Sequence, residues 1–328
     1  MRAAGLWAAI AWAALLAASI GAVAARADGL PVLGIDVGGT GVAALSGGAR
    51  YVTLSAGRNT VLAKVNPHGG RILRSTVLPG IYTIPAVAYD GSASGLSADG
   101  RTLVLIQPRL GFPRARTGLI VLNARLLRPQ RTITLRGDFS FDAVSPQGRF
   151  LYLIQYTSAY DPTRYLVRAY DVRAGQLLAK PVVDPREPGD KMRGSPVTRA
   201  TSPDGRWAYT LYDGPGGTPF VHALDTSTRT ARCIDLPGLS KTSLWQLRFH
   251  LDRTGRTLTL ANGRHPVLAI DTLSFATSAP TAPIAGFPWT LVVLAILGSL
   301  LAAAALGVIL RRRGASLIRP DRTPVRAS

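Results

Sequence analysis

Short apolar runs, each introduced by a polar turn, recur between about residues 42 and 278. The clearest copy is the turn at residues 202–206 (Ser-Pro-Asp-Gly-Arg), which is followed by the apolar run 207–212 (Trp-Ala-Tyr-Thr-Leu-Tyr). In such a turn proline presets φ near about −65°, aspartate bonds back to nearby backbone, and glycine supplies a positive φ. A short apolar run before the turn and a run of β-branched and aromatic residues after it together predict a β-hairpin.

The same hairpin signal returns at a nearly fixed interval. Comparable turns occupy residues 97–101 and 145–149, and weaker copies occupy 46–50 and 252–256. All five end in arginine, at Arg50, Arg101, Arg149, Arg206 and Arg256, so that successive copies are 51, 48, 57 and 50 residues apart. A period near fifty residues predicts a repeat architecture.

A second hairpin signal lies behind each of these strands and is marked by asparagine or aspartate. The marking residues are Asn66, Asn123, Asp171, Asp225 and Asp271. Each follows three or four apolar residues, and a further short apolar run comes next, as at residues 176–182. The side chain of such a residue can close the turn by accepting a backbone hydrogen bond. One repeat is therefore expected to form four short antiparallel strands, which is one propeller blade.

These residues resemble the YVTN and WD40-like β-propeller repeats. The resemblance covers roughly residues 42–278 in five copies of uneven quality, and it is strongest at 254–263 and 267–272. No Trp-Asp dipeptide is present, so the fit to WD40 repeats proper is poor. The resemblance implies an all-β chain that forms a β-propeller of about five four-stranded blades, with six or seven blades as alternatives. Repeats of this kind specify a fold well and a function poorly.

The two ends of the chain read as membrane signals. Residues 1–27 combine Arg2, an uncharged apolar stretch and an Ala-x-Ala site, which is typical of a secretory signal peptide; a retained anchor is the alternative. Residues 279–288 form a proline-rich spacer, and 289–310 are 22 residues without charge that can span a bilayer as a helix. Three arginines at 311–313 place the basic tail 311–328 in the cytoplasm. We therefore expect a single-pass protein of the cell membrane, with an extracytoplasmic propeller domain at 28–278.

Composition adds little about chemistry. The formal net charge is +20, and arginine supplies most of it, with 34 residues against 4 lysines. A GC-rich genome produces such a bias without selection for binding, and nucleic acid is not expected outside the membrane. Four histidines, one glutamate and a single cysteine show no metal-ligand spacing and allow no intrachain disulfide. Neither a cofactor nor a metal is expected.

The candidate binding surface lies in the longer loops of the middle repeats. We expect these loops to expose arginine and aromatic side chains on one face, which is typical of binding surfaces. The candidates are Arg109, Phe112, Arg114, Arg116, Tyr160, Arg164, Arg186, Lys191 and Arg193. Because arginine offers planar donors to phosphate and carboxylate, the expected partner is anionic: lipid headgroups, an acidic envelope polymer or an acidic protein. Solvated loops with arginines of purely compositional origin are the alternative interpretation.

Two functions from different classes follow. The first is a non-catalytic binding or scaffolding module tethered at the bacterial cell surface. The alternative is a propeller enzyme, such as a lactonase-like hydrolase or a quinone-dependent dehydrogenase. Converging carboxylates or histidines in a polar funnel would favour the enzyme, and an axial channel filled by apolar side chains would favour the binding module.

Overall fold

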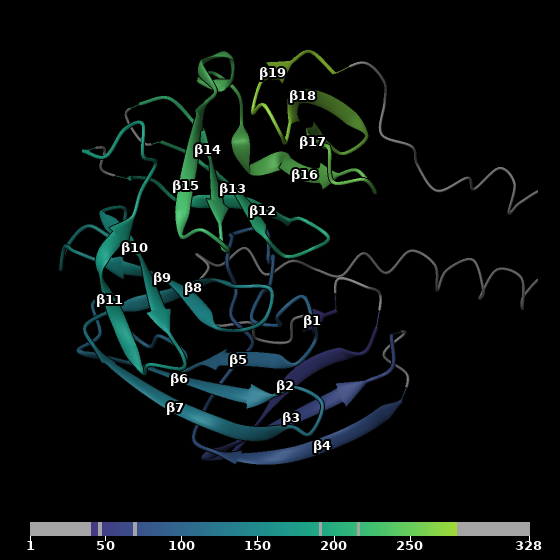
Figure 1. Cartoon of the computed structure of the whole chain (residues 1–328), viewed down its shortest axis with the longest axis vertical. Coiled ribbons are helices and arrows are strands. Elements are labelled where there is room, and N and C mark those ends of the chain that lie inside the picture. The colour runs from purple at the N-terminus through teal and green to yellow at the C-terminus, as the bar shows by residue number, and fades with distance from the viewer. Residues whose placement is uncertain (1–40, 45–47, 68–70, 190–191, 215–216, 281–328) are drawn as a thin grey trace, which may run out of the picture.

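In the described part of the chain, five antiparallel sheets follow one another and surround a common axis (Figure 1). The computed structural model describes residues 41–44, 48–67, 71–189, 192–214 and 217–280. Sheet 1 comprises β1 (Val42–Ala43), β2 (Arg50–Ala56), β3 (Asn59–Val65) and β4 (Ile72–Pro79). Sheet 2 comprises β5 (Thr102–Ile106), β6 (Arg116–Asn123) and β7 (Arg128–Arg136), and sheet 3 comprises β8 (Phe139–Val144), β9 (Phe150–Tyr156), β10 (Tyr165–Asp171) and β11 (Gln176–Val182). Sheet 4 comprises β12 (Pro196–Thr201), β13 (Trp207–Tyr212), β14 (Phe220–Asp225) and β15 (Thr230–Asp235), and sheet 5 comprises β16 (Leu247–Leu251), β17 (Thr257–Asn262), β18 (His265–Asp271) and β19 (Thr277–Ser278). Two short 3-10 helices, η2 (Pro237–Leu239) and η3 (Leu244–Gln246), connect sheets 4 and 5.

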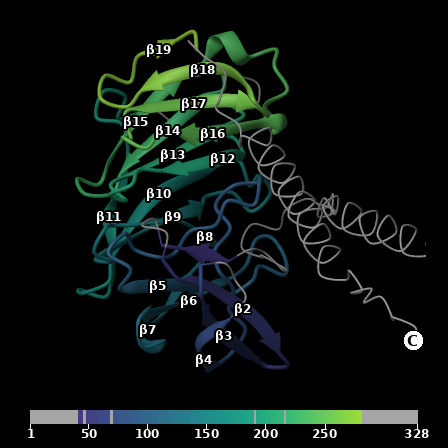
Figure 2. The ribbon, with the colours of Figure 1, turned by 90° about the vertical axis from the view of Figure 1, so that its right-hand side faces the viewer.

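Strand order within each sheet follows chain order, as in a simple meander. The first strand of a sheet lies nearest the axis and the last lies outermost, as β8 and β11 show (Figure 1). In the side view the sheets lie one above another, from sheet 5 at the top to sheet 1 at the bottom (Figure 2). This all-β arrangement of successive antiparallel sheets is consistent with a β-propeller. The strands expected at 176–182 and 207–212 are confirmed at those bounds.

Sheet 2 departs from the predicted four strands. Its three strands are β5, β6 and β7, and residues 81–97 approach β5 only through isolated bridges, from Thr83 to Ile106 and from Leu96 to Leu103. Pro85 cannot donate to a ladder, and Gly95 has φ +112°, with a Cβ there only 2.5 Å from a backbone oxygen. The expectation of four regular strands is therefore wrong for the second repeat.

The repeated serine turn is a closed hydrogen-bond unit. In sheet 4, the Trp207 amide donates to Ser202 Oγ at 2.8 Å, while Ser202 Oγ donates to Asp204 Oδ1 at 2.5 Å. The Arg206 amide donates to the same Asp204 oxygen at 3.0 Å. Sheet 2 repeats this arrangement around Ser97. The sequence motif is thus explained by turn geometry.

The aspartate that marks the second hairpin turn connects this turn to the serine turn of the same sheet. Asp225 Oδ1 accepts the Ser227 amide at 2.9 Å, and its Oδ2 accepts Arg206 Nη2 at 2.7 Å. Asp171 receives Arg149 in the same way at 3.4 Å in sheet 3. In sheets 3 and 4 the arginine of the first turn and the aspartate of the second therefore join the two turns of one sheet.

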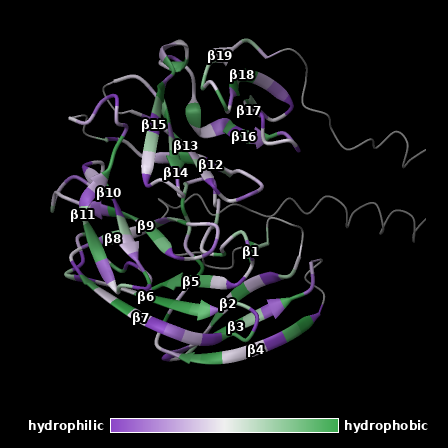
Figure 3. Cartoon of the chain, in the orientation of Figure 1, coloured by the Kyte–Doolittle hydropathy of each residue, from purple (hydrophilic) through white to green (hydrophobic). Residues whose placement is uncertain are grey.

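The hydrophobic core is divided into layers between successive sheets, and the apolar positions concentrate on the strands (Figure 3). Four clusters of buried residues lie at the boundaries between sheets 1 and 2, 2 and 3, 3 and 4, and 4 and 5. In the part of the chain that the structure describes, no such cluster joins sheet 5 to sheet 1. Leu54 and Val77, on the face of sheet 1 turned away from sheet 2, are 57% and 61% exposed.

The predicted membrane segments fall outside the described residues, as does the segment 31–37 that the sequence suggests as an outer strand of the last sheet. This holds for the signal at 1–27, the span at 289–310 and the tail at 311–328. Within the described ranges no helix is long and apolar enough to cross a membrane.

Candidate functional site

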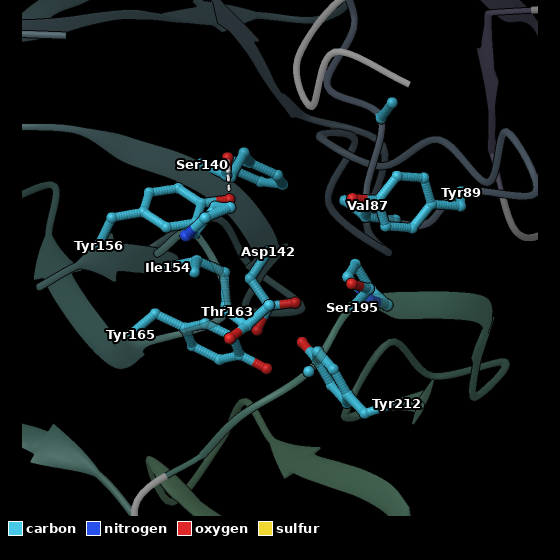
Figure 4. A pocket seen from close by; sticks show the side chains of 15 residues that line it. Val87, Tyr89, Ser140, Asp142, Ile154, Tyr156, Thr163, Tyr165, Ser195 and Tyr212 are labelled. Atoms are coloured by element: carbon cyan, nitrogen blue, oxygen red, sulfur yellow. Dashed lines mark hydrogen bonds between the residues drawn. The ribbon is translucent and has the colours of Figure 1, made fainter. Parts of the chain in front are cut away.

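A small cavity lies between the inner strands of sheets 3 and 4 and the segment 86–89, on the side where β9 turns into β10 (Figure 4). Its volume is about 40 Å³. Lining residues come from the start of β8, the ends of β9 and β13, the start of β10, the residues before β12 and the segment 86–89. We call it the axial cavity. A larger cavity of about 280 Å³ lies at the opposite end, next to the serine turns, and none of the described residues that line it carries a charge.

Among the described residues, Asp142 is the one carboxylate that lines the axial cavity, and it is only 2% exposed. It stands where the register between β8 and β9 shifts, between Phe141 and Ala143. A bulge of this kind redirects a side chain and is common beside functional sites. Oδ1 of Asp142 is bonded to the Arg199 guanidinium, which also donates to the Asp142 carbonyl at 3.1 Å. Oδ2 is buried, with no hydrogen-bond partner among the residues that the structure describes.

Three tyrosines form the wall around this carboxylate. Tyr156 ends β9, Tyr165 begins β10, and Tyr212 ends β13 (Figure 4). Ring centroids are 6.4 Å apart between Tyr156 and Tyr165, and 5.9 Å apart between Tyr165 and Tyr212. Burial raises the pKa of Tyr165 and of Tyr212 above the usual value, so both hydroxyls keep their protons at neutral pH. The cavity therefore offers an acceptor at Asp142 and phenolic hydroxyls beside aromatic faces.

A second buried ion group joins the loop after β5 to the start of β8. Arg109 Nη2 lies 2.7 Å from Asp138 Oδ1 and 3.0 Å from Ser140 Oγ. The Arg114 amide donates to Asp138 Oδ2 at 3.1 Å. Ser140 Oγ is 3.1 Å from the Tyr156 hydroxyl, which connects this group to the cavity wall (Figure 4). The loop of sheet 2 is thereby fixed onto sheet 3.

Three of the sequence-predicted residues are held inside this group. Arg109 is 5% exposed, and the Arg114 side chain is 13% exposed. Phe112 is half-buried, and its ring lies 5.4 Å from that of Tyr156. The expectation that these loop arginines are exposed is wrong for Arg109 and Arg114, because both neutralise the buried Asp138. Their guanidinium groups position the rim of the cavity.

The other predicted residues stand outside it. Arg164 and Arg193 are exposed and are brought together by an isolated backbone bridge. Tyr160 is 96% exposed. Arg116 is exposed, Arg186 is bonded to Asp184 at 2.5 Å, and Lys191 lies outside the described residues. That these residues bind a ligand stays a prediction.

Sequence reasoning missed Asp142, Arg199 and the three tyrosines. A weak signal was present, because Asp142 is the one charged residue of the run 139–144, all of which is buried. Its partner Arg199 lies 57 residues away in β12, and no local pattern connects the two. The sequence analysis expected either converging carboxylates or histidines, which would favour an enzyme, or apolar side chains, which would favour a binding module. The lining of the cavity matches neither description, since it combines one carboxylate with aromatic rings.

His222 lies behind this wall, at the same boundary between sheets 3 and 4. It is 1% exposed, its Nδ1 is 3.9 Å from Cys233 Sγ, and within the described part of the chain its Nε2 has no hydrogen-bond partner. Burial lowers the pKa of His222 to about 4, so the imidazole is neutral at pH 7. Over the described ranges, no group of three histidine, cysteine or acidic residues could hold a metal ion.

No protein-family model matches the sequence, and no curated protein matches it. Solved structures that it resembles include the β-propeller domain of Cps50 (Swd1) from Myceliophteria thermophila, with 11% identity, coverage of 75% of this chain and 70% of that one, and a TM-score of 0.41. The Dos1 propeller shows 10% identity, 73% and 58% coverage and a TM-score of 0.43. Hydrazine synthase of Kuenenia stuttgartiensis shows 14% identity, 70% and 74% coverage and a TM-score of 0.38. At these values the likenesses carry no argument, and the fold rests on the strand order of the chain itself.

Proposed function

We propose that the chain is a membrane-tethered, extracytoplasmic binding module without catalytic activity, whose ligand site is the axial cavity and its rim. The observation that carries this proposal is the buried, unpartnered Oδ2 of Asp142. An unpaired buried acceptor costs free energy, and a ligand that donates a hydrogen bond to it would remove that cost. The repeat fold supports the proposal because it places loops from several sheets around one end of the axis.

The rim of the cavity supports a large partner. Leu110 and Tyr160 belong to the loops after β5 and β9 and are each 96% exposed. Aromatic side chains such as that of Tyr160 are enriched at interaction surfaces. Arg164 and Arg193 add exposed positive charge beside Tyr160. Among the anionic partners considered, an acidic envelope polymer is favoured, because an extended chain can contact both the rim arginines and the cavity.

The tether and its direction follow from the sequence signals at 1–27 and 289–313. Protease added to intact spheroplasts is expected to degrade the repeat domain and to spare the tail after residue 313. Protection of the repeat domain would overturn the extracytoplasmic part of the proposal.

The binding face is tested by photocrosslinking in intact cells. A photoreactive amino acid replaces Tyr160 at the rim, and a matched variant carries it at Leu273, which is 66% exposed in the turn between β18 and β19 at the opposite end. Adducts of raised mass are expected from position 160, weakening with added salt because exposed charges are screened over about 8 Å at 0.15 M. Equal adducts from both positions, or none from position 160, would contradict the proposal.

A further inference from the structure

The axial cavity also carries information about the chemistry of the group that enters it. Its polar requirement is set by Asp142, whose Oδ2 can only accept, and therefore needs a donor. The rings of Tyr156, Tyr165 and Tyr212 leave the other walls aromatic (Figure 4). A matching group must therefore present a hydrogen-bond donor on one side and apolar C–H surface on another.

The charges around the cavity argue against a cation. Asp142 is already paired with Arg199, and Asp138 is paired with both Arg109 and Arg114. Three arginines stand against two aspartates, so 3 − 2 leaves one positive charge in the group. An ammonium group would gain little attraction here and would lose its hydration on entry. An anionic group is also unfavourable, because it has no proton to donate to Oδ2 of Asp142, which can only accept a hydrogen bond.

The volume limits the size of the entering group. A water-sized group needs roughly 10–15 Å³ of such space, and the cavity has about 40 Å³. About three water-sized groups therefore fit, which corresponds to the neighbouring hydroxyls at one edge of a sugar ring. The remainder of the ring would lie at the mouth, against the tyrosine rings.

We propose that the axial cavity binds one edge of an uncharged sugar ring, with a ring hydroxyl donating to Asp142 Oδ2. This proposal rests on the proposed function and names the chemistry of the same site. The phenolic hydroxyls of Tyr165 and Tyr212 complete the recognition, since each can donate to or accept from a second ring hydroxyl. The exposed arginines of the rim contact other, anionic parts of the same polymer.

The test uses the full-length chain in a detergent without a sugar headgroup, and saturation-transfer NMR with a panel of neutral methyl glycosides. Glucosamine and glucuronic acid are compared with methyl N-acetylglucosaminide, because these probes share a ring and differ in charge. At least one neutral glycoside is expected to bind, and more tightly than its charged counterparts. Binding by no neutral glycoside, or tighter binding of glucosamine, would overturn the proposal.

Variants locate the binding. Asp142→Asn puts an amide where the acceptor was, and it is expected to weaken glycoside binding by about tenfold or more. Asp225→Asn is the matched control, because Asp225 is also 2% exposed and paired with an arginine, but lies at the opposite end of sheet 4. Its affinity is expected to equal that of the unaltered chain. Equal weakening in both variants would overturn the assignment.

A third variant keeps the assignment testable if Asp142→Asn does not fold. Tyr165→Phe removes only a hydroxyl from the cavity wall and is expected to weaken binding severalfold, whereas Tyr209→Phe, which faces sheet 5 instead, is expected to leave it unchanged. Unchanged binding in Tyr165→Phe would count against the site. Crosslinks from position 160 without any glycoside binding would refute this inference and leave the proposed function standing.

Discussion

Asp142 of β8 and Arg199 of β12 form an ion pair across the boundary between sheets 3 and 4, with side chains 3% and 5% exposed. The pair joins the innermost strands of two successive sheets, at the wall of the axial cavity. Arg199 also donates to the Asp142 carbonyl, so that one guanidinium holds both the side chain and the backbone of the bulge. The geometry of the cavity therefore depends on this contact between sheets.

Breaking that pair should destabilise the chain strongly. Arg199→Met leaves the Asp142 carboxylate buried without a counter-charge, which costs about 3–5 kcal/mol of unfolding free energy. The measurement is urea unfolding followed by tryptophan fluorescence. The comparison is Arg206→Met, whose partner Asp225 is buried but whose own side chain is 47% exposed. Its loss should be smaller, because Asp225 keeps the backbone amides of Ser227 and Thr228 as hydrogen-bond donors when Arg206 is removed.

A double variant separates the loss of the pair from the loss of packing. Asp142→Leu combined with Arg199→Met removes both charges, and we expect it to be more stable than Arg199→Met alone, because no unpaired charge remains. A double variant as unstable as the single one would show that the charge is not the cause.

His222 should make stability depend on pH. Its pKa is about 4 in the fold, where burial is the main cause, against 6.5 in the unfolded chain. The unfolded state therefore binds the proton more readily, and stability falls as the pH falls from about 6.5 to about 4, by about 3 kcal/mol in all. Below about 4 this contribution is already lost, and above about 6.5 it is fully present.

The pH effect is checked by urea unfolding at several pH values in the unaltered chain and in His222→Gln. The variant should show a much flatter dependence between about pH 4 and pH 6.5, whatever its absolute stability. The pKa values of the buried carboxylates Asp184 and Asp225 are lowered in the fold. Their contribution to stability is therefore lost only at pH values below the usual carboxyl pKa, which lie below the range of the histidine effect. Parallel curves for both proteins would rule out His222 as the source.

The serine of the repeated turn should contribute measurably to stability. Ser202→Ala removes the acceptor of the Trp207 amide and the donor to Asp204, and we expect a loss of about 1 kcal/mol. Ser227→Ala, at an exposed position of the neighbouring turn, should change the unfolding free energy by less than about 0.5 kcal/mol. If the two variants lose the same unfolding free energy, the hydrogen bonds of the serine side chain do not explain why the motif recurs.

The exposed face of sheet 1 motivates a prediction about ring closure. Leu54, Val61 and Val77 lie in register on β2, β3 and β4, and the two outer members are more than half exposed. An uncovered apolar face and open sheet edges are aggregation hazards. We expect the apolar segment 31–37 to supply a closing strand. Replacing residues 29–37 by an equally long Gly-Ser segment should lower the melting temperature by several degrees, and an unchanged melting curve would contradict the prediction.

The repeat fold is visible in the sequence because its signals are local. Residues 202–206 form their turn from hydrogen bonds within five residues, and the same holds around Ser97, so the pattern of turn and strand predicts the hairpins directly. The inner edge of sheet 2 was not predictable in the same way. There Pro85, which cannot donate to a ladder, and Gly95, which has a positive φ, interrupt the inner strand that the repeat pattern predicts.

The site is a different case, since it is made by contacts between sheets. Arg109 and Arg114 look like exposed loop arginines, and only the buried Asp138, which the fold brings beside them, turns them into structural groups. Asp142 meets Arg199 across 57 residues, and the tyrosines that surround it come from three different strands. The sequence by itself determined the repeating strands and turns, because each is stabilised by neighbours in the chain. Tertiary structure alone decided which polar groups are buried, paired or left with an open hydrogen bond, because those properties depend on which sheet packs against which.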